Sequence, residues 1–193
     1  MKILFLNGSP RKNGYTLGLM KCIEKEIDSK HTVEWIHSYD LNMKPCISCL
    51  QCRPNKECIL PKDDGHNVWN KIRSADAIII GSPTYFGNIS GPLKILIDRN
   101  LTAFEEIAAS GLEMPIPLHK GKKAIMITTC NAPFPISQLP TQSKGALQAI
   151  EIVLKAGGYN ILGSITLDGA ASKNEIPSEI QKQAKILVMS LQS

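Results

Sequence analysis

Short apolar segments alternate with longer amphipathic segments along this chain. The apolar or alternating segments are typical of β-strands and lie at residues 2–7, 31–37, 76–81, 122–129 and 160–167. Segments with helical features, such as apolar residues at helical spacing, acids in the first turn or an early proline, lie at residues 15–27, 63–73, 91–100, 143–156 and 177–191. The alternation predicts an α/β fold, a three-layer sandwich in which helices cover both faces of a five-stranded parallel sheet.

Length and composition narrow the class of protein. A chain of 193 residues with 43% hydrophobic and 20% charged residues is typical of one globular domain, and we expect residues 1–193 to form a single domain with a Cys-rich loop at about 45–62. The net charge of +5 comes from scattered basic residues, and aromatic residues make up only 5%, so nucleic-acid binding is not expected.

The chain also lacks the sequence features of a membrane or exported protein. No apolar stretch approaches the roughly 18 residues that span a bilayer. The first apolar run ends in a Gly-Ser-Pro turn rather than a cleavage site for a signal peptide. We therefore expect no membrane partner and a cytoplasmic location.

Two connecting segments are longer than such a sandwich needs. Residues 101–121 and 131–142 are proline-rich and partly apolar. Segments of this kind often form lids or interfaces, but a variable surface connection is an equally good interpretation.

In an open α/β sheet, ligands bind beyond the carboxyl ends of the strands, so we expect the binding residues to lie in the loops after the strands. The first loop, Asn7–Thr16, contains two glycines that permit close backbone approach, several hydroxyl and amide side chains, and Arg11. It leads into a helix, whose N-terminus favours an anion. These features predict a phosphate-binding loop, although the spacing matches neither common nucleotide fingerprint and a plain turn before a capped helix has the same features.

The loop after the third strand, residues 81–92, combines small residues with the adjacent aromatics Tyr85 and Phe86. Exposed backbone amides next to apolar rings suit a planar heteroaromatic ligand such as a flavin. Residues Thr84 to Asn88 would then supply amides to the polar edge of the ring, while the flavin performs the redox chemistry.

With these loops, the sequence resembles the flavodoxin-like NAD(P)H-dependent FMN reductase family. The resemblance rests on the motifs NGSPRKNGYT, DAIIIGSPTYFGNISGPLKILIDR and KAGGYNILGSITLDG, which occur in the right order over essentially the whole chain. It implies a flavodoxin-like fold with strand order 2-1-3-4-5, and a homodimer or higher homo-oligomer.

The resemblance also assigns residues to the FMN cofactor. The residues implied to hold the phosphate are Ser9, Arg11, Asn13 and Thr16. Those implied to contact the isoalloxazine ring are Pro83, Thr84, Tyr85, Phe86, Gly87 and Asn88, with Thr129 and Cys130 from the fourth-strand loop.

A cluster of cysteines follows the second strand with the spacing C-x2-C-x2-C-x5-C. Its members are Cys46, Cys49, Cys52 and Cys58. In a cytosolic chain such a cluster indicates metal or redox chemistry rather than disulfides. Four thiolates can ligate a [4Fe-4S] cluster or zinc, and unmetallated thiols that pack or react are the third interpretation.

The cysteine spacing and its place after the second strand resemble the iron-sulfur flavoproteins, a branch of the same superfamily. The resemblance implies an FMN-dependent oxidoreductase that transfers electrons from NAD(P)H to an acceptor such as a quinone, a flavin or a protein, with the cluster as a one-electron relay. The alternative is a non-enzymatic electron carrier reduced by a ferredoxin-type partner, and a third reading is a zinc-stabilised module without flavin.

Other polar residues have structural explanations. Lys94 and Asp98 have the i,i+4 spacing of a surface helical pair, and Cys22 occupies a helical core position. The four histidines form no ligand pattern. We expect no dedicated catalytic acid, base or nucleophile, and therefore no catalytic residue beyond the cofactor site.

Overall fold

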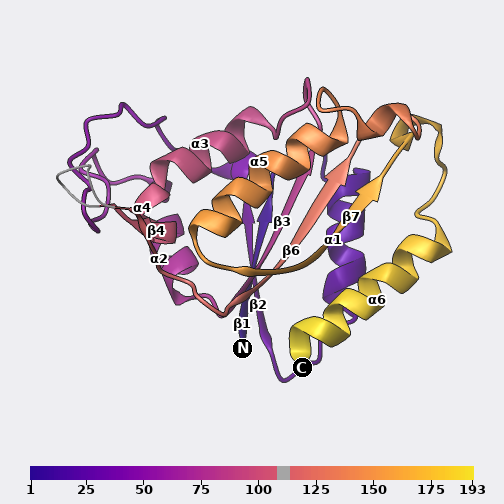
Figure 1. Cartoon of the computed structure of the whole chain (residues 1–193), viewed down its shortest axis with the longest axis horizontal. Helices are drawn as coiled ribbons and strands as arrows, with labels where there is room; N and C mark the ends of the chain where they lie inside the picture. Colours follow the sequence, from indigo (N-terminus) through magenta and orange to yellow (C-terminus); the bar gives the residue numbers. More distant parts are fainter. Residues whose placement is uncertain (108–113) are drawn as a thin grey trace.

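The computed structural model describes residues 1–107 and 114–193, and its centre is a five-stranded parallel sheet (Figure 1). The strands stand in the order β2-β1-β3-β6-β7. Their bounds are Lys2–Asn7 for β1, Thr32–His37 for β2, Ala77–Pro83 for β3, Lys123–Thr129 for β6 and Asn160–Leu167 for β7. Because β6 and β7 are the fourth and fifth strands of this sheet, the predicted flavodoxin-like order 2-1-3-4-5 is confirmed.

Helices cover both faces of the sheet, as the alternation of elements predicts (Figure 1). One face packs against α2 (Asp64–Ser74), α3 (Gly91–Arg99) and α5 (Ser143–Ala156), and the other packs against α1 (Tyr15–Lys25) and α6 (Ser178–Gln192). This arrangement produces two hydrophobic cores, one in each layer between the sheet and its helices.

Successive side chains along a strand point to opposite faces of the sheet, so the apolar residues of each strand alternate between the two cores. On β1, Leu4 and Leu6 face the core with α2, α3 and α5, whereas Ile3 and Phe5 face the core with α1 and α6. Strands buried on both faces need no polar positions, which explains why residues 77–80 of β3 form a continuous apolar run.

The register aligns the carboxyl ends of the strands at one edge of the sheet. At that edge Asn7 of β1 pairs with His37 of β2 and with Gly81 of β3, and Pro83 of β3 pairs with Thr129 of β6. The loops that carry the predicted binding residues therefore leave the sheet side by side.

The main departures from the sequence-based prediction are short elements. The helix predicted to reach Ile27 ends at Lys25. The connection predicted at 101–121 contains α4 (Leu101–Phe104) and a small antiparallel pair formed by β4 (Glu105–Glu106) and β5 (Ile116–Pro117), while part of it, 108–113, lies outside the described residues. Single 3₁₀ turns occur at Ser38–Asp40, Ile136–Gln138 and Ala170–Ser172. Elements of this length are too short to show a repeating pattern of apolar residues, so the sequence pattern does not predict them.

In the part of the chain that the structure describes, no helix has the length and apolar character needed to cross a bilayer. Every strand of the main sheet contributes to the same pair of cores. The expectation of a single domain over residues 1–193 stays a prediction.

Candidate functional site

A cavity of about 690 Å³ opens at the carboxyl edge of the sheet. Cavities of this size are typical of sites for small molecules and cofactors. Most of the residues predicted to bind the cofactor line it, namely Ser9, Arg11, Thr16, Pro83, Thr84, Tyr85, Phe86, Thr129 and Cys130. Asn13, Gly87 and Asn88 lie in the same loops but do not line the cavity.

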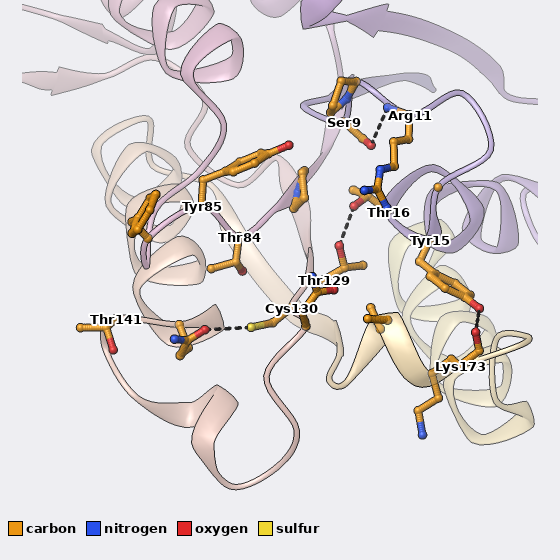
Figure 2. Close-up of a pocket in the computed structure, with 18 residues that line it drawn as sticks. Ser9, Arg11, Tyr15, Thr16, Thr84, Tyr85, Thr129, Cys130, Thr141 and Lys173 are labelled. Atoms are coloured by element: carbon orange, nitrogen blue, oxygen red, sulfur yellow. Dashed lines mark hydrogen bonds between the residues drawn. The ribbon is translucent and has the colours of Figure 1, made fainter.

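Figure 2 shows how the cavity is divided. Ser9, Arg11 and Thr16 lie on one side, Thr84 and Tyr85 lie on the other, and Thr129 and Cys130 lie between them.

The first loop is held in a tight turn by short hydrogen bonds. The Gly8 amide donates to the Gly81 carbonyl at 2.7 Å, and the Ser9 amide donates to Asn7 Oδ1 at 3.0 Å. A side chain at Gly8 would lie 3.1 Å from that same carbonyl oxygen and 2.9 Å from Leu93 Cδ2, so glycine is needed for this close approach. The Arg11 amide donates to Ser9 Oγ at 3.2 Å, which leaves the Ser9 hydroxyl hydrogen free to donate into the cavity.

The start of α1 supplies further donors. The first backbone bond of this helix runs from the Gly18 amide to the Gly14 carbonyl, and Gly14 has no capping side chain. Among the described residues, the amides of Tyr15, Thr16 and Leu17 consequently have no acceptor. Together with the helix dipole, these amides favour a bound anion.

Charge at this end of the cavity also favours an anion. The Arg11 guanidinium makes no ion pair within residues 1–107 and 114–193 and is exposed. Lys173 lines the same cavity, and its carbonyl accepts a hydrogen bond from the Tyr15 hydroxyl, which ties the segment after β7 to the start of α1 (Figure 2). Thr16 Oγ1 and Thr129 Oγ1 lie 2.8 Å apart and join the first loop to β6.

The opposite wall is a closed turn that presents an aromatic side chain to solvent. Tyr85 and Asn88 exchange both backbone hydrogen bonds at 2.9 Å, and the Thr84 amide donates to the Thr129 carbonyl at 2.9 Å. Phe86 has a φ of 48° and Gly87 a φ of 74°, both in the left-handed region. The Phe86 side chain is fully exposed at the mouth of the cavity.

The turn is fixed by backbone packing against the segment before α5. A side chain at Gly87 would lie 2.6 Å from the Pro140 carbonyl oxygen, and one at Gly145 would lie 2.1 Å from that oxygen and 2.2 Å from the Gly87 carbonyl oxygen. At the base of the cavity, Cys130 Sγ donates to Gln142 Oε1 at 3.2 Å. The 131–142 segment thus helps to build the cavity wall.

Several lining residues were not found by sequence reasoning. They are Pro10, Gly14, Tyr15, Asn131, Thr141, Gln142, Ala170, Ala171 and Lys173. Pro10, Gly14 and Tyr15 lie within a motif that was recognised. Asn131, Thr141 and Gln142 lie in the 131–142 connection, which was interpreted as a possible lid or interface but not assigned to the cofactor. The segment 170–173 carries no motif, and its position at the same edge as the other loops is the one signal that points to it.

The residues of the cavity fit FMN. A phosphate monoester matches the free amides of α1, the Ser9 hydroxyl and the Arg11 guanidinium, because all of them donate hydrogen bonds and the last is a cation. A planar ring matches the side of the cavity that is lined by Pro83, Tyr85 and Phe86.

The four clustered cysteines lie on one loop as free thiols. Cys46 is exposed, and Cys49, Cys52 and Cys58 are half-buried free thiols. Burial raises the pKa of the Cys52 thiol, and the neighbouring Cys58, Cys46 and Cys49 raise it further. Across the described residues, no three Cys, His, Asp or Glu side chains form an arrangement that would hold a metal ion.

The ends of the cysteine loop are anchored to α2, α3 and α4. The buried Arg99 donates to the Lys44 carbonyl at 2.5 Å, and Thr102 Oγ1 donates to the Lys56 carbonyl at 2.7 Å. His66 Nε2 lies 2.8 Å from the Cys58 carbonyl oxygen. The loop is therefore attached at its beginning and again close to its last cysteine.

The chain matches known families over most of its length. Residues 1–156 match the family model described as NADPH-dependent FMN reductase. An iron-sulfur flavoprotein of Clostridioides difficile is 30% identical over 192 residues, which are 96% of this chain and 77% of that protein. An iron-sulfur flavoprotein of Archaeoglobus fulgidus is 45% identical over 104 residues, so this match spans about half of each chain, 53% and 50%.

Solved structures show the same fold at low sequence identity. An NAD(P)H:quinone oxidoreductase from Methanothermobacter marburgensis superposes with a TM-score of 0.73 at 16% identity, covering 100% of this chain and 98% of that one. An FMN-dependent NADH-azoreductase from Bacillus anthracis, solved in complex with FMN, gives a TM-score of 0.70 at 16% identity, covering 100% and 98%. The family match, and the relative that is matched over 96% of this chain and 77% of its own length, together show that the chain belongs to the NADPH-dependent FMN reductase family and to the iron-sulfur flavoproteins.

Proposed function

We propose that this chain binds FMN and transfers electrons from NAD(P)H to an acceptor such as a quinone, a flavin or another protein. One observation carries the proposal: a single cavity joins the free amides at the start of α1 and the Arg11 guanidinium to the exposed aromatic turn at Tyr85 and Phe86. An anion site beside an apolar, amide-rich turn suits a flavin phosphate and its ring.

The proposed roles follow the two sides of the cavity. The phosphate is assigned to Ser9, Arg11, Asn13 and Thr16, of which Asn13 rests on the family resemblance alone because it does not line the cavity. The ring is assigned to residues 83–88 together with Thr129 and Cys130. Bound FMN would supply the redox chemistry, and the protein groups would orient the ring and exclude water.

Two kinds of comparison support the redox activity. The matching family model carries the name of a reductase that uses NADPH and FMN. Proteins of the same fold carry names of quinone and azo reductases that use NAD(P)H or NADH. The donor, the acceptor and the preference between NADH and NADPH are proposals for this chain.

Titration of purified protein with FMN, followed by flavin fluorescence, tests the binding step. Arg11→Met removes a charge-assisted donor worth roughly 1.5–3 kcal/mol, so we expect FMN affinity to fall about 10-fold to 100-fold. Riboflavin, which lacks the phosphate, should bind both proteins equally. Lys12→Met is the matched control, because Lys12 is an exposed cation of the same loop that does not line the cavity. Absence of FMN binding by the unmodified protein would overturn the proposal.

Anaerobic mixing of the FMN-loaded protein with NADPH tests the enzymatic step. Rapid loss of the flavin absorption is the expected result. If NADPH reduces the flavin slowly and a reduced ferredoxin reduces it rapidly, the protein is instead an electron carrier served by a ferredoxin-type partner. This second function is supported by the relatives, which are named iron-sulfur flavoproteins.

We also propose that Cys46, Cys49, Cys52 and Cys58 hold a [4Fe-4S] cluster that relays single electrons. The support is the spacing of four free thiols on one anchored loop and the naming of the relatives, since these thiols form no metal-binding arrangement in the part of the chain that the structure describes. Iron and sulfide assays after anaerobic purification test it, with Cys49→Ser expected to lose iron and Cys22→Ser to retain it. Zinc without sulfide, or no metal, would contradict the proposal.

We also propose that the chain forms a homodimer or a higher homo-oligomer and acts in the cytoplasm. Exposed apolar side chains, among them Phe86, Phe134, Ile136 and Leu139, lie in the segments that form the cavity rim and support a covered surface there. Sedimentation velocity of the FMN-loaded protein should give the mass of a dimer or a higher oligomer. A monomer at micromolar concentration would contradict it.

A further inference from the structure

A buried hydrogen-bond relay connects the second strand to the phosphate loop. Asn7, the last residue of β1, is 2% exposed. Its Oδ1 accepts from the Ser9 amide at 3.0 Å, and its Nδ2 lies 2.9 Å from Nδ1 of His37, the last residue of β2. Asn7 and His37 are register partners, so the sheet itself sets this contact.

The direction of the hydrogen bonds fixes the state of the imidazole. The Ser9 amide needs an acceptor, which orients the Asn7 carbonyl toward Ser9 and its NH₂ group toward His37. The NH₂ group can only donate, so His37 Nδ1 must accept through its lone pair. The contact therefore requires a neutral ring with its hydrogen on Nε2, because a protonated ring has no acceptor.

The surroundings leave the ring both oriented and accessible to protons. His37 stacks on Trp35 with a ring-centroid distance of 5.5 Å and an interplanar angle of 5°. The ring also lines a small surface cavity of about 230 Å³. The charged groups that line this cavity are Asp40 from the turn after β2, and Asp64 and Lys71 from α2.

Of these charged groups, Lys71 is itself paired with Glu34 at 2.7 Å. Protonation of the His37 ring would remove the lone pair on Nδ1 that accepts from Asn7, so the relay depends on the neutral ring.

We propose that His37 is a positioning residue for the FMN phosphate and makes the affinity for FMN sensitive to pH. Neutral His37 holds Asn7, Asn7 holds the Ser9 turn, and the turn presents the Ser9 hydroxyl to the phosphate. Protonation of His37 removes its acceptor, releases Asn7 and loosens the turn. The inference rests on the proposed binding of FMN in the main cavity.

The test compares FMN dissociation constants between pH 5.5 and 8 for the unmodified protein, His37→Asn and His37→Phe. Asparagine places Oδ1 where the histidine has Nδ1, so His37→Asn keeps an acceptor at every pH. Phenylalanine keeps the ring over Trp35 but accepts nothing. At pH 8 we expect His37→Asn to bind like the unmodified protein and His37→Phe to bind about 3-fold to 10-fold more weakly, the effect of one hydrogen bond.

The pH profiles distinguish the relay from the ligand's own titration. Phosphate monoesters take up a proton near pH 6, so the affinity of all three proteins falls somewhat in acid. The unmodified protein should lose an additional factor of about 3 to 10 relative to His37→Asn as the pH falls from 8 to 5.5. Riboflavin should show no such difference. Parallel profiles for the unmodified protein and His37→Asn would overturn the inference.

Two further measurements separate positioning from a general structural effect. His37→Phe should have no further effect on FMN affinity in an Asn7→Ala background, because the relay is already broken. His31→Asn is the matched control, since His31 precedes the same strand at the opposite edge of the sheet and contacts the N-terminus at 3.1 Å. Failure of the unmodified protein to bind FMN would overturn the proposed function and this inference together, whereas FMN binding that His37→Phe leaves unchanged at pH 8 would overturn this inference alone.

Discussion

Arg99 and Asp63 form a two-point ion pair beneath the cysteine loop. Nη1 lies 2.9 Å from Oδ2 and Nη2 lies 3.0 Å from Oδ1, and the Arg99 side chain is only 1% exposed. The same guanidinium holds the Lys44 carbonyl, and the same carboxylate caps α2 by accepting from the Gly65 amide at 3.0 Å. This pair therefore joins the end of α3, the start of α2 and both flanks of the cysteine loop.

Removing the negative charge from this pair should destabilise the protein. Asp63→Asn leaves the buried Arg99 charge without its partner, so we expect the free energy of unfolding to fall by about 3 kcal/mol in urea denaturation at pH 7. Asp98→Asn is the control, because the Lys94–Asp98 pair is about half-exposed on α3 and should change stability by less than about 1 kcal/mol. Equal effects of the two substitutions would contradict the role given to Asp63.

The same pair contributes to acid sensitivity. Burial acts to raise the pKa of Asp63, but the Arg99 guanidinium and the backbone amides of Lys44 and Gly65 outweigh it and hold this pKa below its usual value. The stabilisation is therefore complete above the ordinary pKa of an aspartate and is lost as the pH falls through the lowered value. In Asp63→Asn the unfolding free energy should decline less steeply over this acidic range.

A second pH dependence comes from His119, which is 2% exposed and stacks on Tyr159 at 4.7 Å. Burial lowers the pKa of His119 to about 4. The unfolded chain takes up the proton first, at about pH 6.5, so stability is complete above that pH and declines toward pH 4. We expect a loss of about 3 kcal/mol over this interval relative to His119→Gln, measured by urea denaturation at several pH values.

Glutamine is the suitable replacement because it retains an amide donor for the Ala103 carbonyl, which His119 Nε2 contacts at 2.7 Å. Carboxylates titrate equally in both proteins, so the difference between the two curves isolates His119. Curves that remain parallel from pH 7 to pH 4 would show that His119 is not held neutral by burial.

Gly145 should be essential to the cavity wall. Gly145→Ala would place a methyl group against the carbonyl oxygens of Pro140 and Gly87, so the turn that carries Phe86 must move. We expect a loss of about 1–3 kcal/mol in stability and weaker FMN binding by fluorescence titration. Gly91→Ala on α3 is the control, because nothing lies within 4 Å of its new methyl group and alanine favours the helix.

We expect the exposed Phe86 side chain to contribute to FMN binding and not to stability. Its φ of 48° is unfavourable for any side chain and most unfavourable for a β-branched one. Phe86→Gly should be at least as stable as the unmodified protein, and Phe86→Val should be less stable by about 1–2 kcal/mol, while both bind FMN more weakly. Ile186→Gly is the control: Ile186 is 63% exposed on α6 and does not line the cavity, so glycine there should only reduce stability.

The order of elements and the sheet were readable from the sequence because hydrophobic periodicity is a local property. Runs such as Ala77–Pro83 are apolar at nearly every position, and only a strand covered on both faces tolerates this. The loops after the first, third and fourth strands line one cavity, as expected when parallel strands bring their carboxyl ends to one edge.

Local sequence could not show which distant segments complete the cavity. Gln142 and Lys173 reach it from beyond β6 and β7, and their neighbours in the sequence carry no motif. The cysteine spacing was evident, but the anchoring of the loop by Arg99 depends on how α2 and α3 pack together.

The sequence by itself determined the parallel sheet, the two helical layers, the glycine-containing loop after the first strand and the cysteine spacing, because each depends on residues close together in the chain. The tertiary structure alone decided the contact of Asn7 with His37, the packing of Gly145 against the aromatic turn and the ion pair of Arg99 with Asp63. Those contacts join segments that are remote in sequence, and their formation depends on strand register and helix packing, which no local pattern encodes.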